Sequence, residues 1–191
     1  GAHFVSGQGA KWLSAPLGSG YLWVSPDLPP EITPRTAGWF GMELNHDSYT
    51  DRAIQPKSNA NRFASGTVPL ASAFGLRRAC EVILEAGRER CEEQAVRHAD
   101  AIDEAATASG IEIFSDRRDE SGNLGLQRSA IISLRLDNAP ELVDSLRSAN
   151  VVFSVRNGLL RLSPHWYNTA EEMGTVCEIV RRSAPTDVGR G

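Results

Sequence analysis

Apolar residues recur with different periods along the chain, and these periods predict its elements. From Pro69 to Leu84 they recur every three or four positions, which predicts an amphipathic helix. Pro69 suits the first turn of that helix, and Gly87 is a point at which it would bend or break. A second helical stretch continues to about Ser109, where Gly110 would end it. The longest helical region is therefore expected in the middle of the chain.

Short apolar stretches near the N-terminus predict two strands. They cover residues 3–6 and 20–24, and a Gly/Pro/Ser-rich turn separates them. Residues 25–62 hold five of the ten prolines and show little periodicity, which predicts a long loop region with at most short elements. Loops of that length usually belong to a site or to an interface.

The part of the chain beyond Gly110 has the pattern of a compact α+β domain. The predicted elements are a strand at 111–114, a hairpin-like polar loop at 116–125, strands at 130–136, 151–155 and 159–162, and a helix at 139–150. The dipeptide Asn157-Gly158 favours a tight hairpin turn before the last of these strands.

A final helix and a tail complete the predicted elements. Thr169 and Glu172 match a capping box at the start of the helix, which is expected to end near Arg182. Residues 185–191 are expected to be a disordered tail.

Composition narrows the class of protein. The chain has 191 residues, of which 41% are hydrophobic and 23% charged, as in ordinary globular proteins. A net charge of −4 argues against nucleic acid or an anionic membrane as a partner. No apolar run is long enough to cross a bilayer, and the first residues lack the pattern of a secretory signal. Three cysteines, none in a metal-ligand spacing, favour a reducing compartment, so we expect a cytoplasmic protein without a metal site.

One lysine stands out as a candidate for chemistry. Lys11 is one of only two lysines beside eighteen arginines, and it lies in the turn between the first two predicted strands. A lysine amine can form a Schiff base with an aldehyde cofactor such as pyridoxal phosphate, more readily when burial or a nearby cation lowers its pKa. A surface lysine beside a turn is the alternative on spacing alone.

Three segments, read in order, resemble a known family. They are Lys11-Trp12-Leu13-Ser14-Ala15-Pro16-Leu17-Gly18-Ser19-Gly20, then Arg62-Phe63-Ala64-Ser65-Gly66-Thr67, and finally Val155-Arg156-Asn157-Gly158-Leu159-Leu160-Arg161-Leu162-Ser163-Pro164-His165-Trp166-Tyr167-Asn168-Thr169. Together they resemble the C-terminal half of a class V aminotransferase-fold enzyme, a pyridoxal-phosphate enzyme of fold type I. Within this family, the first and third segments resemble the isopenicillin N epimerase-like and C–S lyase-like branch.

The resemblance covers roughly residues 3–182 and implies an α/β fold. Residues 1–108 would be the C-terminal part of the large, cofactor-binding domain, including the long connecting helix. Residues 109–184 would form a small α+β domain, followed by the tail at 185–191.

The resemblance also implies roles for individual residues. Lys11 would bind pyridoxal 5'-phosphate as a Schiff base and then move the α-proton of the substrate. Arg161 would bind the substrate α-carboxylate through its two-pronged donor group, and a structural ion pair is the alternative. Thr67 and the Gly66 amide would bind the cofactor phosphate of the neighbouring subunit, because the family dimerises across its active sites. A helix N-cap is another reading of Thr67, and both readings can hold at once.

Other residues carry weaker expectations. Trp39 and Phe40 could line the substrate pocket or simply pack at an interface. His165 is expected to be a packing residue, and Cys177 to lie in the core of the last helix.

The chain departs from the family in two ways. Ala10 stands where a histidine often precedes the lysine, and no cysteine lies between Arg156 and Arg161, which argues against the persulfide chemistry of a cysteine desulfurase. Members are also about twice as long, and their N-terminal half supplies most of the cofactor site, including the Asp that pairs with the ring nitrogen. We therefore expect a lysine-bearing half that a separate or cleaved N-terminal half completes, in a homodimer-type assembly.

The expected activity on a small amino-acid substrate begins with removal of the α-proton. Cleavage of a C–S bond by β-elimination is favoured, and epimerisation or transamination are the alternatives. A non-catalytic dimerisation partner is a further alternative, against which the joint presence of Lys11, Thr67 and Arg161 speaks.

Overall fold

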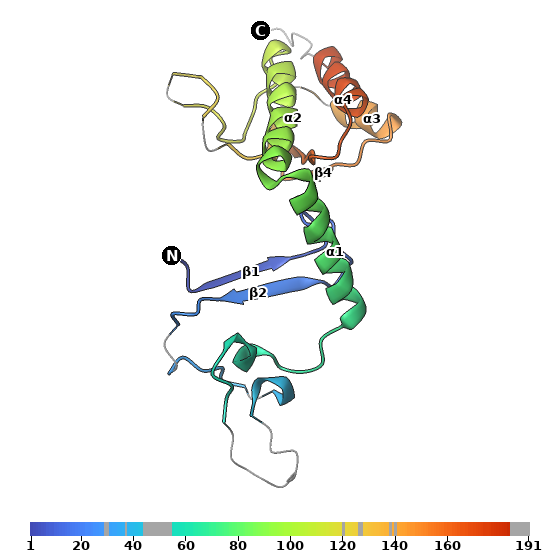
Figure 1. Ribbon diagram of the computed structural model, residues 1–191. Helices are drawn as coiled ribbons and strands as arrows, with labels where there is room; N and C mark the ends of the chain where they lie inside the picture. Colours follow the sequence, from blue (N-terminus) through green and yellow to red (C-terminus); the bar gives the residue numbers. More distant parts are fainter. Residues whose placement is uncertain are drawn as a thin grey trace. The chain divides into compact units, whose positions relative to one another are not determined.

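The computed structural model describes residues 1–28, 31–36, 38–43, 55–119, 121–125, 128–137, 139 and 141–183 (Figure 1). The chain divides into two compact units, Gly1–Glu85 and Ala86–Gly191. The second of the two long helices packs against elements of the C-terminal unit. The domain boundary at 108/109 expected from the sequence stays a prediction.

The first unit begins with an antiparallel hairpin. Strand β1 (Phe4–Gln8) pairs with β2 (Gly20–Val24), so that Phe4 lies opposite Val24 and Gln8 opposite Gly20. Figure 1 shows the two arrows side by side. Both strands were predicted, and β1 extends two residues further than expected because its pairing continues to the start of the lysine turn.

Two short 3-10 turns and a helix complete the described elements of this unit. The turns are η1 (Trp39–Gly41) and η2 (Ala60–Phe63), which lie in the region predicted as a long loop, and the helix is α1 (Leu70–Ala86). Helix α1 ends at the residue before Gly87, whose φ of 90° is readily adopted only by glycine. The predicted break is thereby confirmed.

The hairpin exposes apolar side chains on both of its faces. Phe4 and Leu22 lie on one face and Val5 and Trp23 on the other, and each is 41–49% exposed. Helix α1 likewise has no buried residue, although its apolar spacing predicted a packed face. Strands that are apolar on both faces are typical of the interior of a larger sheet. In the described part of this unit, Phe63 packs against Phe4 with the two rings edge to face, and the four side chains nevertheless remain exposed.

The second unit is a layer of helices on a small sheet. Its elements are α2 (Arg88–Ala108), β3 (Ile132–Arg135), α3 (Glu141–Ser148), β4 (Ser154–Arg156), β5 (Leu159–Leu162) and α4 (Ala170–Arg182). The sheet order is β3-β5-β4, and both pairings are antiparallel. Helix α4 packs against α2 and α3, and α2 also contacts β3.

The core of the second unit lies between these helices and the sheet. Its largest fully buried apolar side chains come from α2, β3, α3, β5 and α4: they are Ile102, Ile132, Leu134, Leu142, Leu146, Leu160 and Val180. Burial of each such side chain contributes about 1.5–3 kcal/mol relative to exposure. This unit therefore has the packed core that the first unit lacks in its described residues.

Two strands of this unit differ from their predicted extents. Residues 111–114 contribute only a single bridge, Ile113 to Leu134. Strand β4 begins at Ser154 rather than at Val151, because Asn150 (φ 57°) and Val151 terminate α3, with the Val151 amide donating to the Leu146 carbonyl at 3.0 Å.

The hairpin turn and the helix cap that the sequence predicted in this unit are confirmed. Asn157 and Gly158, with φ of 52° and 75°, form the two-residue turn between β4 and β5. At the start of α4, the Thr169 hydroxyl accepts from the Glu172 amide at 3.2 Å, and the Glu172 carboxylate accepts from the Thr169 amide at 2.8 Å. The predicted tail at 185–191 lies outside the described residues.

Over the described ranges, the helices are too short or too polar for any of them to span a membrane.

Candidate functional site

Lys11 lies in a loop that is fixed by its own backbone hydrogen bonds. The Gly9 amide donates to the Ser19 carbonyl at 2.9 Å, which closes the loop at the end of the hairpin. Inside it, the Ala15 amide donates to the Gly9 carbonyl and the Ser14 amide to the Lys11 carbonyl, both at 3.0 Å. Lys11 is therefore the first residue of a tight turn, and its backbone position is set by the strand pair.

The loop also packs against helix α1 of the same unit. A methyl group added at Gly75 would lie 2.3 Å from Cγ of Pro16, a distance well inside van der Waals contact. Only glycine leaves room for the proline ring at this point of the helix. The contact between Pro16 and Gly75 thus fixes the lysine loop on α1.

The Lys11 side chain is exposed, and its amine has no carboxylate within ion-pair distance in the described ranges. An amine without an ion pair is available to react with a carbonyl group. The described residues of this chain do not provide the burial that would desolvate this amine.

The predicted phosphate-binding residues lie in the segment between η2 and α1. Around Gly66, the position where a Cβ would be has no atom within 4 Å, so its backbone faces open space. Thr67 is exposed. The Ala73 amide donates to the Pro69 carbonyl at 3.0 Å as the first bond of α1, so the helix starts beyond Thr67 and an N-cap role does not account for this residue. A free hydroxyl and an open backbone suit a phosphate contact.

The predicted substrate-pocket residues form the turn η1. Trp39 and Phe40 are 55% and 44% exposed. The turn is closed by the Gly41 amide, which donates to the Gly38 carbonyl at 2.9 Å, and it packs against η2. The structure therefore brings Trp39 and Phe40 to the same part of the first unit as the segment that ends at Thr67.

Arg161 lies in the second unit, on strand β5. It is opposite Ser133 of β3 and Ser154 of β4, and its side chain is exposed. No carboxylate in the described ranges forms an ion pair with its guanidinium, so a structural ion pair does not explain the residue there. An exposed guanidinium can bind a carboxylate through two parallel hydrogen bonds.

The segment that follows Arg161 has a structural role. Buried His165 stacks on Tyr167 with ring centroids 4.3 Å apart, and the His165 amide donates to Oδ1 of Asn168 at 2.7 Å. Together with the capping box at Thr169, these contacts connect the end of β5 to the start of α4. The interpretation of His165 as a packing residue agrees with this geometry.

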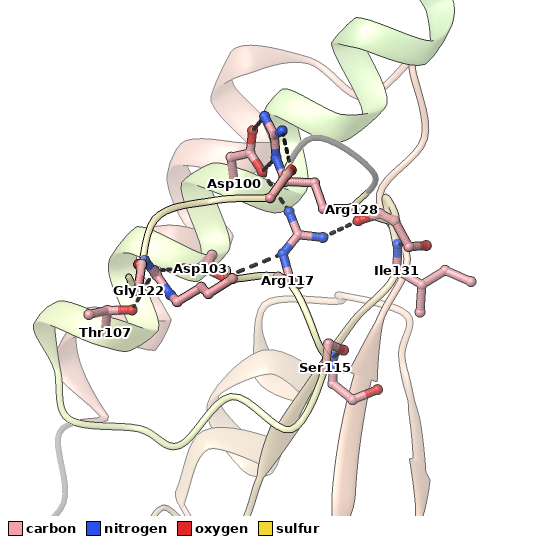
Figure 2. A network of polar contacts seen from close by, with 12 residues as sticks. Asp100, Asp103, Thr107, Ser115, Arg117, Gly122, Arg128 and Ile131 are labelled. Carbon is pink, nitrogen blue, oxygen red and sulfur yellow. Dashed lines mark hydrogen bonds and ion pairs between the residues drawn. The ribbon is translucent and has the colours of Figure 1, made fainter. Parts of the chain in front are cut away.

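A buried polar network in the second unit was not predicted (Figure 2). Asp100 of α2 accepts bonds from Arg128 at 2.7 and 2.6 Å and from Arg117 at 2.6 Å. Asp103, one turn further along, pairs with Arg118 and lies 3.3 Å from Nε of Arg117. The latter is an ion pair without the alignment of a hydrogen bond, since neither atom has a hydrogen-bond partner.

The network connects helix α2 to the segment that follows Ile113, the residue that forms the β-bridge. One signal could have revealed it: Asp100 and Asp103 occur among buried Ala99, Ile102 and Ala106 of α2. Carboxylates on a buried helix face need cationic partners. All members are paired with one another, so the network holds structure and contains no open group for a ligand.

The cysteines contribute no site. Cys91 and Cys177 are buried, Cys80 is half-buried, and all three are free thiols. Burial raises the pKa of the Cys177 thiol, which keeps it protonated and unreactive. Within the described ranges, no group of acidic, histidine or cysteine residues could hold a metal ion.

No protein-family model matches the chain, but individual proteins do. An uncharacterized aminotransferase, YcbU of Bacillus subtilis, is 26% identical over 174 residues, covering 91% of this chain and 43% of the relative. The apo structure of a cysteine desulfurase from Thermococcus onnurineus matches with a TM-score of 0.76 at 19% identity, covering 96% of this chain and 47% of the other. The cystine C–S lyase C-DES, in complex with its product cysteine persulfide, matches with a TM-score of 0.72 at 17% identity, covering 93% and 46%.

These likenesses establish the fold. The homologues are aminotransferase and cysteine desulfurase enzymes of class V, of the pyridoxal-phosphate fold type I, and they cover most of this chain. A further structure of C-DES carries a PLP cofactor with glycine covalently linked to it. The chain spans less than half the length of each of these relatives.

Proposed function

We propose that this chain is the lysine-bearing C-terminal part of a pyridoxal-phosphate enzyme that acts on an amino acid. The observation that carries the proposal is the exposed Lys11 amine, held at the end of a hairpin and without a carboxylate partner in the described ranges, in a chain whose relatives are such enzymes. The groups present fit the cofactor: an amine suits its aldehyde, and an open backbone amide with a hydroxyl, at Gly66 and Thr67, suits its phosphate.

The named residues then have distinct tasks. The bound cofactor supplies an electrophilic carbonyl and a ring that accepts electrons from the substrate Cα. Lys11 binds the cofactor and afterwards carries the substrate α-proton on its Nζ atom. Arg161 holds the substrate carboxylate, which orients the Cα–H bond, and Gly66 and Thr67 hold the phosphate of the cofactor in the neighbouring subunit of a homodimer.

We further propose that the reaction is β-elimination at a C–S bond. The α-proton is removed, the C–S bond breaks, and sulfur leaves with the bonding electrons. The remaining carbon skeleton is hydrolysed to a keto acid and ammonia. Support comes from the likeness to the C–S lyase C-DES and from the β4–β5 turn. Arg156 lies directly opposite Leu159 there, so the turn has no room for a loop with a nucleophilic cysteine.

The proposed enzyme also requires an N-terminal half, as a preceding segment or as a separate or cleaved chain. Two observations support this: the relatives are more than twice as long as their matched parts, and the hairpin exposes apolar side chains on both faces. The exposed face of α1 is a further surface for that half or for the second subunit of a homodimer. The free thiols fit the reducing cytoplasm that we propose as its location.

Borohydride reduction of the complete protein from its native host tests the cofactor assignment. We expect a phosphopyridoxyl adduct on the peptide that contains Lys11, and its loss in Lys11→Ala. Lys57→Ala is the matched control, because Lys57 is the only other lysine and should leave the adduct intact. An unmodified Lys11 in the complete protein would refute the proposal.

The reaction is tested with cystine as the substrate. Release of pyruvate and ammonia without added keto acid is expected for β-elimination. Racemised amino acid without pyruvate would indicate an epimerase instead, and a requirement for a keto acid acceptor would indicate an aminotransferase.

A further inference from the structure

We infer that the buried polar network of the second unit positions Arg161 for the substrate carboxylate, with Asp100 and Ser115 as the positioning residues. The inference rests on the proposed function, because it takes Arg161 as the group that binds this carboxylate. It adds a path of contacts that leads from a buried carboxylate on α2 to the strand that carries Arg161.

Arg161 lies on the face of the sheet that points away from the core. Alternate residues of a strand point to opposite faces of a sheet. On β3 and β5, the residues that flank Ser133 and Arg161 are all buried in the core: they are Ile132, Leu134, Leu160 and Leu162. Ser133 and Arg161, which are opposite each other in register, therefore share the other face, where Arg161 is exposed.

Ser133 directs its backbone groups away from β5, toward residues 114 and 115. Its amide donates to Oγ of Ser115 at 2.8 Å, and its carbonyl accepts from the Phe114 amide, also at 2.8 Å. Ser133 and Arg161 therefore form a non-hydrogen-bonded pair of the antiparallel ladder, the kind of pair in which the opposite side chains lie closer together. A displacement of Ser133 is then passed directly to the base of the Arg161 side chain.

The acceptor at Ser115 is a side-chain oxygen at a position where a ladder ordinarily uses a backbone carbonyl. The neighbouring bond is regular, since the Arg135 amide donates to the Glu112 carbonyl at 2.9 Å. Removal of the Ser115 hydroxyl would leave the partly buried Ser133 amide without its acceptor, so that β3 would no longer be fixed at this point. The hydroxyl thus determines where Ser133 lies.

Asp100 in turn holds the segment that contains Ser115. Arg117, two residues further along, has a side chain that is 1% exposed and donates to Oδ1 of Asp100 at 2.6 Å. Arg128 donates to both oxygens of Asp100 at 2.7 and 2.6 Å, and Figure 2 shows the two arginines converging on this carboxylate. Arg117 also donates to the carbonyl of Ser129, three residues before β3 begins. One buried carboxylate therefore holds both the segment beside β3 and the segment that leads into it.

A network that only stabilises the unit differs measurably from one that positions Arg161. Loss of a purely stabilising contact lowers the free energy of unfolding and leaves ligand recognition by the folded protein unchanged. Loss of a positioning contact also weakens the preference for a substrate that carries a carboxylate, because a guanidinium binds this group through two bonds of defined direction.

Substrate discrimination by the complete protein tests the inference. The readout is the ratio of kcat/KM for cystine to kcat/KM for cystine dimethyl ester, in which the carboxylates are esterified and uncharged. Ser115→Ala should lower this ratio about tenfold, because it displaces Arg161 from the carboxylate. Ser115→Thr should retain the ratio, because threonine keeps the hydroxyl. Asp100→Asn should lower the ratio, because it weakens the hold on both segments.

Ser109→Ala is the matched control, because the Ser109 hydroxyl also joins two segments of this unit, by donating from the end of α2 to the Arg181 carbonyl of α4 at 3.2 Å. It should leave the ratio unchanged. An unchanged ratio in Ser115→Ala, or an equal loss in Ser109→Ala, would overturn the inference. An unchanged ratio in Arg161→Lys, or a wild-type protein that does not turn over cystine, would instead refute the proposed function on which the inference rests.

Hydrogen exchange covers the case in which Asp100→Asn does not fold, and it needs no substrate. Exchange of backbone amides, measured by mass spectrometry on the peptide that contains β5, reports how firmly this strand is held. Ser115→Ala should speed exchange in β5, which pairs with β3, and leave exchange in α3 unchanged. Exchange in β5 equal to that of the wild type would show that Ser115 does not control the strand that carries Arg161.

Discussion

Arg117 and Asp103 face each other in the interior of the second unit, with side chains 1% and 0% exposed and the Nε and Oδ2 atoms 3.3 Å apart. A charge in this position cannot be hydrated, so each residue depends on its partners. Asp103 keeps Arg118 as a second partner, and Arg117 keeps Asp100. The pair therefore belongs to a network. We expect the substitution of any single residue of this network to lower the free energy of unfolding.

Arg117→Met should destabilise the protein by about 3 kcal/mol, because it leaves the buried Asp103 carboxylate with a single, half-exposed cation. Chemical denaturation monitored by circular dichroism measures the free energy of unfolding. Asp144→Ala is the control, because its ion pair with Arg147 is exposed and should contribute less than about 1 kcal/mol. Equal effects of the two substitutions would contradict a stabilising role for the network.

Gly75→Ala should displace the lysine loop, because its methyl group would overlap the Pro16 ring. We expect slower reductive modification of Lys11 by pyridoxal phosphate and a lower midpoint of thermal unfolding. Pro16→Ala in the same protein should restore both, since it removes the overlapping ring atoms. Failure of this second substitution to rescue the first would show that the contact does not position the loop.

Thr169→Ala should lower the free energy of unfolding by about 1 kcal/mol, the usual contribution of an N-cap. The change removes the acceptor for the Glu172 amide and leaves that donor without its partner. Thr175→Ala, further along the same helix, is the control, because its hydroxyl bonds only to the preceding turn at the Glu171 carbonyl. It should not destabilise the protein.

His98 should make the stability of the protein depend on pH. Burial lowers its pKa below the ordinary value of 6.5, and Arg97 on its own helix acts in the same direction. A bond with the Asn168 backbone and the Glu172 charge on α4 oppose the shift without cancelling it. Below pH 6.5 the unfolded chain therefore binds a proton more readily than the folded one, so stability falls with the pH until the folded protein also titrates.

His98→Gln should flatten this dependence between neutral pH and the lowered pKa of His98, as measured by urea denaturation at a series of pH values. Glu172 contributes a separate loss at lower pH. Its pKa is lowered chiefly by the bond from the Thr169 amide, so its contribution is present above the ordinary value of 4.5 and lost as the pH falls through the lowered value. If the free energy of unfolding of His98→Gln still changes with pH near pH 6, another group causes the dependence.

The parts of the fold that the sequence predicted are those determined by neighbouring residues. The Asn157-Gly158 turn, the break at Gly87 and the capping box at Thr169 all depend on residues within a few positions of one another. The start of β4 was predicted too early, because Asn150 and Val151 serve to end α3 and are not available for pairing.

The parts that could not be predicted depend on contacts across long stretches of chain. The pairing of Asp100 with Arg128 joins residues 28 positions apart, and the contact of Gly38 with Ser65 joins two segments without any regular period. For the candidate site, the sequence indicated Lys11, Thr67 and Arg161 through family resemblance. It gave no indication that Trp39 and Phe40 are held against the segment before Thr67.

The β1–β2 hairpin is apolar on both faces, and this affects the order in which the protein assembles. A pair of strands with Phe4 and Leu22 on one side and Val5 and Trp23 on the other gains little by forming in water, and its open edges would pair with strands of other chains. The hairpin is therefore expected to form late, together with whatever covers it. Because the Lys11 loop closes only when these strands pair, the Lys11 amine is expected to reach its place at the same moment.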